Sequence, residues 1–222
     1  MLQAYLQHSQ YYNPNTMNFG SFLLVVVLAA GLGNADKVPD FVIKGKCPVV
    51  DEQSLWNKQL PRLSEIYLLS KFGGVWFQQA ITTNPYQLLD KCVRLQYDFD
   101  GKGFDATATG LTAEGGLLKR RGKIVPMPLG DPHLMVNFDN SFPAPLLILD
   151  TDYENYACLY SCMNYNHDYH SDFSFIFTRS ETPSNSHLKK CEKVFRSIGV
   201  NTRRFFKTVQ GNVCSYDKQV TL

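Results

Sequence analysis

Residues 93–109 read VRLQYDFDGKGFDATAT, and this stretch decides the fold class. Residues 93–99 alternate between apolar and polar side chains, which is the pattern of a half-buried β-strand. Residues 100–103, Asp-Gly-Lys-Gly, have the composition of a tight turn. Residues 104–109 then return as a second strand. The stretch therefore predicts an antiparallel β-hairpin.

Similar short segments recur on both sides of this hairpin, separated by turns that contain Gly or Pro. The further predicted strands are residues 76–81, 117–125, 133–138, 146–149, 155–162, 172–178 and 203–209. Residues 186–198 differ, because their apolar side chains recur at helical spacing. Ser184 or Ser186 can cap this helix and Gly199 can end it. The pattern predicts an all-β barrel or sandwich with one C-terminal α-helix.

The composition is that of a soluble globular chain. The 222 residues include 22 basic and 20 acidic side chains, and 44% of residues are hydrophobic. The near balance of charge argues against a nucleic-acid partner. The aromatic content of 13% is high for core filling alone. The chain carries no G-x-S-x-G, phosphate-binding Gly-rich loop or H-E-x-x-H motif, so we do not expect an enzyme.

The N-terminal 35 residues contain no Lys, Arg, Asp or Glu. Within them, Phe22–Leu32 is an apolar run that as a helix would be about 16 Å long, roughly half of a bilayer core. Small residues before Asp36 suit a cleavage site. We expect residues 1–35 to be a signal peptide. Within them, Met17 is the better initiator, and residues 1–16 are a spurious or extended leader. Residues 36–222 are then expected to be one secreted domain without membrane insertion. The alternative is a buried N-terminal helix.

All six cysteines lie in residues 36–222. An even number in an oxidising compartment predicts three disulfides, with fifteen possible connectivities. Cys158 and Cys162 lie about 13 Å apart along one predicted strand, so they cannot bond to each other. No C-x2-C pair is present, and we expect no metal site.

Two polar clusters have ordinary structural interpretations. The cluster His167, Asp168, His170 and Asp172 is interpreted as a polar hairpin tip rather than a metal site. The basic run at residues 119–123 is interpreted as a solvated strand end.

Three motifs carry a resemblance to a known family. Gly74-Val75-Trp76, Thr151-Asp152-Tyr153 and Arg179 match, in order and spacing, the three sequence motifs of the lipocalins. Further segments resemble the crustacyanins, the carotenoid-binding lipocalins of crustaceans. These segments are residues 36–41, 84–88, 154–162 and 169–175, and residues 207–211 resemble the C/A1 subunit type. The resemblance implies an eight-stranded antiparallel up-and-down β-barrel around a hydrophobic cavity, with a C-terminal helix.

The resemblance also implies which residues pair with one another. It implies disulfides Cys47–Cys162, Cys92–Cys214 and Cys158–Cys191. It implies that Trp76 and Arg179 pack together at the closed barrel end as a cation–π pair. Residues 62–70 lengthen the segment before Trp76 relative to the family, either as a genuine loop or as an artefact of the gene model.

For function, the resemblance implies binding of astaxanthin or a related carotenoid. The residues expected at its oxygenated end ring are Gln78, Tyr86, Gln87, Tyr97 and His133. An imidazole at His133 can donate to a keto oxygen and shift the absorption to longer wavelength; the alternative is a surface or capping histidine. Leu95, Met135 and Phe138 replace polar residues of the family, so the ligand or its geometry can differ.

The resemblance further implies a heterodimer with the other crustacyanin subunit type and higher oligomers. The alternative function is that of an apolipoprotein-D-like carrier of retinoid, sterol or fatty acid.

Overall fold

The computed structural model describes residues 41–50, 65–128, 131, 133–165 and 168–216. These residues belong to the compact unit of residues 40–222. The expected signal peptide, residues 1–35, lies outside the described residues.

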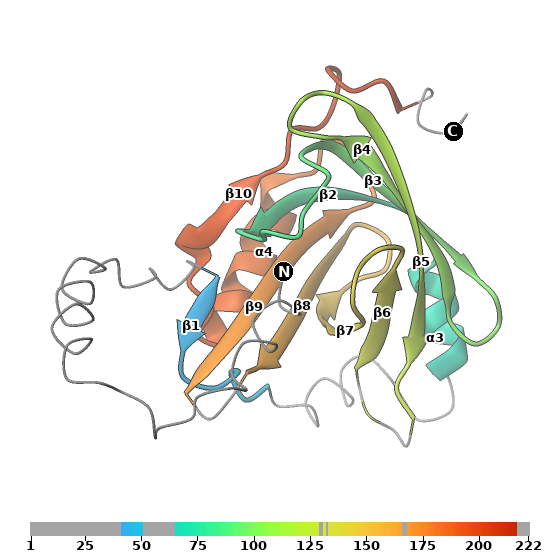
Figure 1. Ribbon diagram of the computed structural model, residues 1–222. Helices are drawn as coiled ribbons and strands as arrows, with labels where there is room; N and C mark the ends of the chain where they lie inside the picture. The colour runs from blue at the N-terminus through green and yellow to red at the C-terminus, as the bar shows by residue number, and fades with distance from the viewer. Residues whose placement is uncertain (1–40, 51–64, 129–130, 132, 166–167, 217–222) are drawn as a thin grey trace, which may run out of the picture. The chain divides into compact units, whose positions relative to one another are not determined.

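Eight antiparallel strands close into a barrel, as the family resemblance implies (Figure 1). The strands are β2 (Gly74–Thr82), β3 (Lys91–Phe99), β4 (Phe104–Leu111), β5 (Leu117–Pro126), β6 (Leu134–Phe138), β7 (Ala144–Thr151), β8 (Tyr156–Asn164) and β9 (Tyr169–Thr178). Each strand pairs with the next along the chain, and β9 pairs back with β2 between Phe77↔Thr178 and Ile81↔Phe175. The predicted hairpin at residues 93–109 is the β3–β4 pair, with Phe99 opposite Phe104.

Two short strands extend the sheet beyond the ring. β1 (Val42–Lys44) pairs with the part of β9 that β2 leaves unpaired, at residues 169–171. β10 (Phe205–Lys207) pairs with residues 80–82 of β2. The predicted last strand at residues 203–209 is thus shorter, because the 3-10 helix η2 (Thr202–Arg204) occupies its start.

Helix α4 (Asn185–Ser197) packs outside the barrel on β7, β8 and β9. Ser184 is the N-cap, and its hydroxyl accepts a hydrogen bond from the backbone N–H of Ser186. Beneath α4 lies an apolar cluster that includes Tyr160, Ile176 and Phe195. The helix therefore covers one outer face of the barrel, and a separate cluster fills the barrel interior.

Helix α3 (Glu65–Phe72) precedes β2. Residues 65–70 belong to the segment whose status as a loop or artefact was open, and the structure shows that they are helical. Phe72, at the end of α3, is buried and stacks on Trp76 with ring centroids 5.0 Å apart. The helix thus supplies an apolar plug for one end of the barrel.

The structure contains the three disulfides that the resemblance implies. They join Cys47 to Cys162, Cys92 to Cys214 and Cys158 to Cys191, with Cα–Cα distances of 5.9, 5.5 and 5.3 Å. The Cys158–Cys191 bond holds α4 on β8, and both of its cysteines are fully buried.

Candidate ligand-binding cavity

The closed end of the barrel is built around Trp76 and Arg179. Trp76 is fully buried, and its indole N–H donates to the carbonyl of Phe72. The Arg179 guanidinium carbon lies 3.8 Å from the Trp76 ring centroid. Gly74 has φ of +88°, and a Cβ there would lie 3.3 Å from Arg179 Nη1. Glycine is therefore required at this position both for the backbone conformation and for the close approach of the arginine.

Arg179 also donates three hydrogen bonds to backbone carbonyls from separate segments. Its Nε, Nη1 and Nη2 donate to Tyr153, Val75 and Lys71 at 3.0, 2.8 and 2.9 Å. These carbonyls belong to the β7–β8 turn, β2 and the end of α3. One planar side chain therefore ties three elements together at the closed end.

The turn that presents Tyr153 is held by its two preceding residues. The Thr151 hydroxyl donates to the carbonyl of Tyr156 and accepts from the N–H of Tyr153. The Asp152 carboxylate accepts the backbone N–H of Asn155 and of Tyr156, at 2.7 and 3.1 Å. The Thr151-Asp152-Tyr153 motif therefore has a structural role in shaping this turn.

Above the closed end lies a cavity of about 220 Å³. Its wall is mainly apolar, with Leu95, Leu146 and Phe177 among its side chains. The interior faces of all eight barrel strands, β2 to β9, contribute. A largely apolar, concave site with few polar groups is the usual form of a small-molecule site.

Four of the five predicted ligand residues line this cavity: Gln78, Tyr86, Gln87 and Tyr97. Gln78 is buried, and its amide donates to the Thr208 hydroxyl at 2.9 Å. Tyr97 is also buried, and burial raises the pKa of its hydroxyl, which therefore stays neutral.

Tyr86 and Gln87 lie in the β2–β3 loop at the other end of the barrel from Trp76. Tyr86 is 41% exposed, and its ring lies 5.1 Å from that of Phe142 and 6.0 Å from that of Phe41. The Gln87 amide donates to the carbonyl of Leu89. Three aromatic rings from distant parts of the sequence thus meet at the mouth of the cavity.

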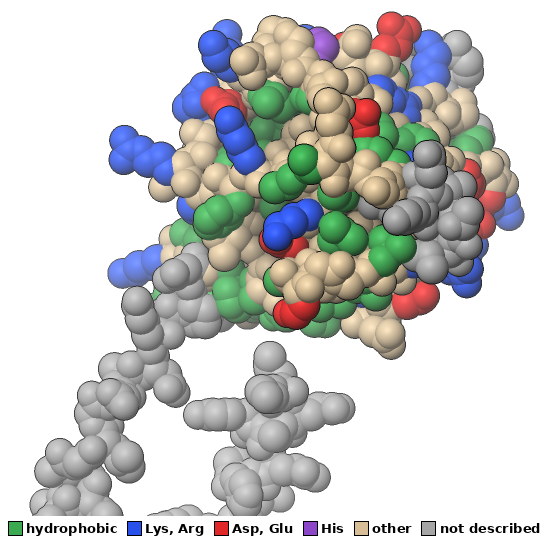
Figure 2. Space-filling view, turned by 90° about the horizontal axis from the view of Figure 1, so that it is seen from above, with side chains coloured by type: hydrophobic (Ala, Val, Ile, Leu, Met, Phe, Trp, Pro, Cys, Tyr) green, Lys and Arg blue, Asp and Glu red, His purple; other side chains and the backbone are tan. Residues whose placement is uncertain are grey.

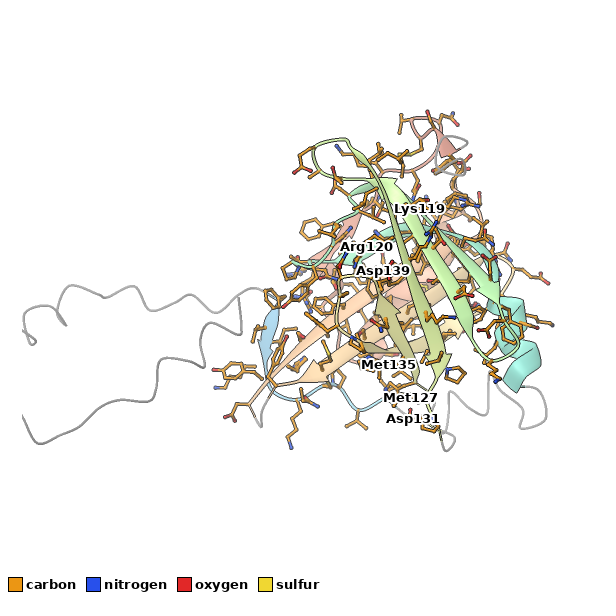
Figure 3. All side chains as sticks on the ribbon, turned by 45° about the vertical axis from the view of Figure 1, so that its right-hand side comes forward. Lys119, Arg120, Met127, Asp131, Met135 and Asp139 are labelled. Atoms are coloured by element: carbon orange, nitrogen blue, oxygen red, sulfur yellow. A yellow bond between two sulfur atoms is a disulfide. The ribbon has the colours of Figure 1, made fainter. Side chains whose placement is uncertain are left out.

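His133 is not among the residues that line the cavity. It lies just before β6, in the β5–β6 connection at the closed end, where its Nδ1 is 2.5 Å from Asp131 Oδ1. The same carboxylate accepts the His133 backbone N–H, and this bond lowers the pKa of Asp131. Figure 3 shows Asp131 at the opposite end of β5 from Arg120. The structure thus places His133 beside Asp131 at the closed end and outside the cavity wall.

Comparison with known proteins supplies the family. The model of the lipocalin / cytosolic fatty-acid binding protein family matches residues 73–212. Over 84% of this chain and the full length of the relative, 56% of residues are identical to the crustacyanin-C1 subunit of Homarus gammarus. The chain is a lipocalin of the crustacyanin group.

Solved structures agree with this assignment. Lobster apocrustacyanin A1 is 54% identical to this lipocalin and superimposes with a TM-score of 0.76, covering 84% of this chain and 100% of that chain. Mouse apolipoprotein D is 26% identical over 195 residues, covering 86% of this chain and 96% of that protein. The crustacyanins are thus much nearer to this chain in sequence than apolipoprotein D is.

Of the three positions that depart from the family, two line the cavity of this lipocalin. Leu95 and Phe138 contribute to the wall, whereas Met135 does not. Four polar lining residues were not predicted from the sequence: Asn84, Arg120, Ser141 and Ser161. Ser161 is buried, and its hydroxyl has no hydrogen-bond partner among the described residues. The alternation of β8 could have revealed it, because Leu159, Ser161 and Met163 share one face.

The basic run on β5 is only partly a solvated strand end, which corrects the expectation for this segment. Arg121 is exposed, but Arg120 lines the cavity. Strand alternation explains the difference, since Arg120 and Ile124 share the inward face.

The outer surface of this lipocalin, seen from above, mixes basic, acidic and hydrophobic side chains (Figure 2). Among the described residues, no helix is long and apolar enough to cross a membrane. The same part of the chain contains no group of three or more side chains that could hold a metal ion.

Proposed function

We propose that this lipocalin holds the oxygenated end ring of a carotenoid, astaxanthin or a close relative, in its cavity and shifts the absorption of the pigment to longer wavelength. The observation that carries the proposal is the composition of the cavity. Rigid apolar and aromatic side chains form most of its wall, and a few polar side chains, Gln78, Tyr97 and Ser161 among them, interrupt it. Such a wall suits an apolar ring that carries oxygen atoms.

The size of the cavity favours a shared ligand. At about 220 Å³ it is smaller than the roughly 300–1,000 Å³ of sites that enclose a drug-sized molecule. A carotenoid is longer than such a molecule, so one barrel encloses only one end. The other end then needs a second cavity, and we propose that the other crustacyanin subunit type supplies it in a heterodimer that associates into higher oligomers.

His133 remains a proposed ligand contact, now with a specific chemical requirement. Asp131 engages Nδ1, so only Nε2 is left to meet a ligand. Since the Asp131 carboxylate can only accept at Nδ1, donation from Nε2 to a keto oxygen requires the doubly protonated imidazolium. Contact also requires the ligand to reach the closed end of the barrel.

Secretion is part of the proposal. All six cysteines are in disulfides, and disulfides of this kind form and persist in oxidising compartments. N-terminal sequencing of the protein purified from its source tests this directly, and a first residue at Asp36 is expected.

Reconstitution tests the pigment-binding function. The oxidised protein is mixed with astaxanthin, alone and together with a subunit of the other crustacyanin type, and the absorption spectrum is recorded. A shift to longer wavelength is expected, larger with both subunits present. If neither mixture shows a shift, the proposal is wrong. Competition with a fluorescent fatty acid distinguishes the carrier alternative, which requires tight fatty-acid binding and no carotenoid binding.

A further inference from the structure

Arg120 is a partly buried cationic side chain in the wall of a mainly apolar cavity, and its guanidinium makes an exposed hydrogen bond to the β6–β7 loop at the open end. It lies on the inward face of β5, opposite Ala108 of β4, and both residues line the cavity. Its neighbours in the same wall include Leu95, which pairs with Ala108, and Ile124. The next pairs on the same inward face toward the closed end are Tyr97↔Ala106 and Ala106↔Gly122. Arg120 therefore lies about 7 Å along the strand from the level of Tyr97.

The protein itself holds the guanidinium in place but does not neutralise it. Nη2 donates to the backbone carbonyl of Asp139, in the β6–β7 loop, and the guanidinium carbon lies 5.7 Å from the centroid of the Phe138 ring. Figure 3 shows Arg120 and Asp139 side by side. Among the described residues, no carboxylate forms an ion pair with Arg120. A guanidinium has five N–H donors, so the contact with Asp139 leaves donors that can point to a ligand.

The surroundings of this charge favour an electron-rich partner. Tyr97, which also lines the cavity, is neutral because burial raises its pKa. A ligand that fills the cavity excludes water, which strengthens the field of a fixed charge. An unpaired cation facing a purely hydrocarbon ligand would be unfavourable, whereas a carbonyl oxygen can accept a charge-assisted hydrogen bond from it.

We propose that Arg120 donates a hydrogen bond to the carbonyl oxygen of the ligand's end ring and supplies the positive charge that shifts the pigment's absorption. This inference rests on the proposed function, and it identifies the group that selects an oxygenated carotenoid over a hydrocarbon one. A cation at one end of a conjugated chain stabilises electron density drawn toward that end. This lowers the energy of the excited state and moves the absorption to longer wavelength.

Arg120 and His133 are alternatives for this role, because they lie at different depths. His133 adjoins Leu134, which pairs with Pro126 at the far end of β5. Arg120 and Pro126 are six residues apart on one strand, so they are separated by roughly 20 Å. A single carbonyl oxygen cannot contact both side chains.

The experiment compares Arg120→Gln with a matched control, Arg121→Gln, in the complete oxidised protein. The control removes the same charge from the adjacent, exposed position of β5. The absorption maximum and the dissociation constant are measured with astaxanthin and with β-carotene, which is a hydrocarbon. For Arg120→Gln we expect loss of most of the red shift and about 10- to 100-fold weaker astaxanthin binding, as for a lost charge-assisted hydrogen bond. Binding of β-carotene should stay equal or improve.

Further variants separate this role from a structural one. Arg120→Lys keeps the charge and should retain part of the red shift, which a merely structural role would not predict. Equal weakening for both pigments in Arg120→Gln would contradict the proposal, as would an unchanged red shift with astaxanthin. A red shift that survives in Arg120→Gln but is lost in His133→Ala would assign the role to His133 instead. Absence of any shift in the wild-type protein would overturn the proposed function itself, which is a separate result.

Discussion

Substitution of Arg179 by methionine tests the account of the closed barrel end. The change removes the guanidinium but keeps an unbranched apolar side chain against Trp76. It therefore deletes the contacts of the charged head while leaving most of the packing. The three backbone carbonyls of Lys71, Val75 and Tyr153 lose their donor at the same time.

The expected loss of stability follows from these contacts. A hydrogen bond from a charged group contributes about 1.5–3 kcal/mol when well buried, and a cation–π contact about 1 kcal/mol. Arg179 is half-buried, so water can partly replace the lost donors, and its three hydrogen bonds are not additive. We therefore expect the free energy of unfolding to fall by about 3–4 kcal/mol, with a melting temperature about 10 °C lower. Arg179→Lys keeps a positive charge near the Trp76 ring but lacks the planar guanidinium group. We therefore expect about half of the loss in unfolding free energy that Arg179→Met causes.

Urea denaturation of the oxidised protein measures the effect, with Arg121→Met as the control on an exposed position. The control should change the unfolding free energy by less than about 0.5 kcal/mol. The m-value should be unchanged, because the native barrel is retained. A loss below about 1 kcal/mol for Arg179→Met would refute the reasoning, since the three hydrogen bonds would then contribute nothing beyond solvent contacts.

Three other predictions concern the barrel itself. A Cβ at Gly122 would lie 2.6 Å from the carbonyl oxygen of Asn137. Gly122→Ala should therefore lower the free energy of unfolding, measured by thermal unfolding, by about 2 kcal/mol. A decrease below about 0.5 kcal/mol would contradict this. Replacement of both Cys158 and Cys191 by alanine removes a crosslink between residues 33 apart and should cost about 4 kcal/mol, measured by denaturation against the oxidised parent; an equal midpoint would count against it. Because burial raises the pKa of Tyr97, the folded protein keeps a proton that an unfolded tyrosine loses near pH 10, so stability is full below that pH and falls above it. Circular dichroism at rising pH should show a shallower alkaline loss for Tyr97→Phe, and identical profiles would argue against the burial effect.

The sequence predicts the barrel strands because alternation is a local property. Residues 93–99 show it clearly, and the structure places them in β3. β1 is only three residues long, too short to show a period, and it forms because the edge of β9 at residues 169–171 is available. Helix α3 was not predicted, since its amphipathic pattern spans only eight residues and its role is to cover Trp76.

The candidate site was predictable only in part. Gln78 and Tyr97 line the cavity as expected, because they lie on strands whose inward face follows from alternation. His133 lies in a connection, where no period gives the direction of a side chain. Arg120 was assigned to solvent from its charged neighbours, although alternation places it on the face of Ile124. The charge of the run therefore gave the wrong environment for Arg120, whereas the alternation of the strand gives the inward face.

Closure of the eight-strand ring also bears on how copies of this chain can associate. In the described part of the chain, the strands that flank the ring, β1 and β10, have three residues each. A flanking strand this short offers few unpaired backbone groups to an incoming strand, which is one way proteins avoid uncontrolled aggregation. Any association of copies of this chain would therefore use side chains and loops, so a change of partner could evolve by surface substitution without any disturbance of the hydrogen-bonded barrel.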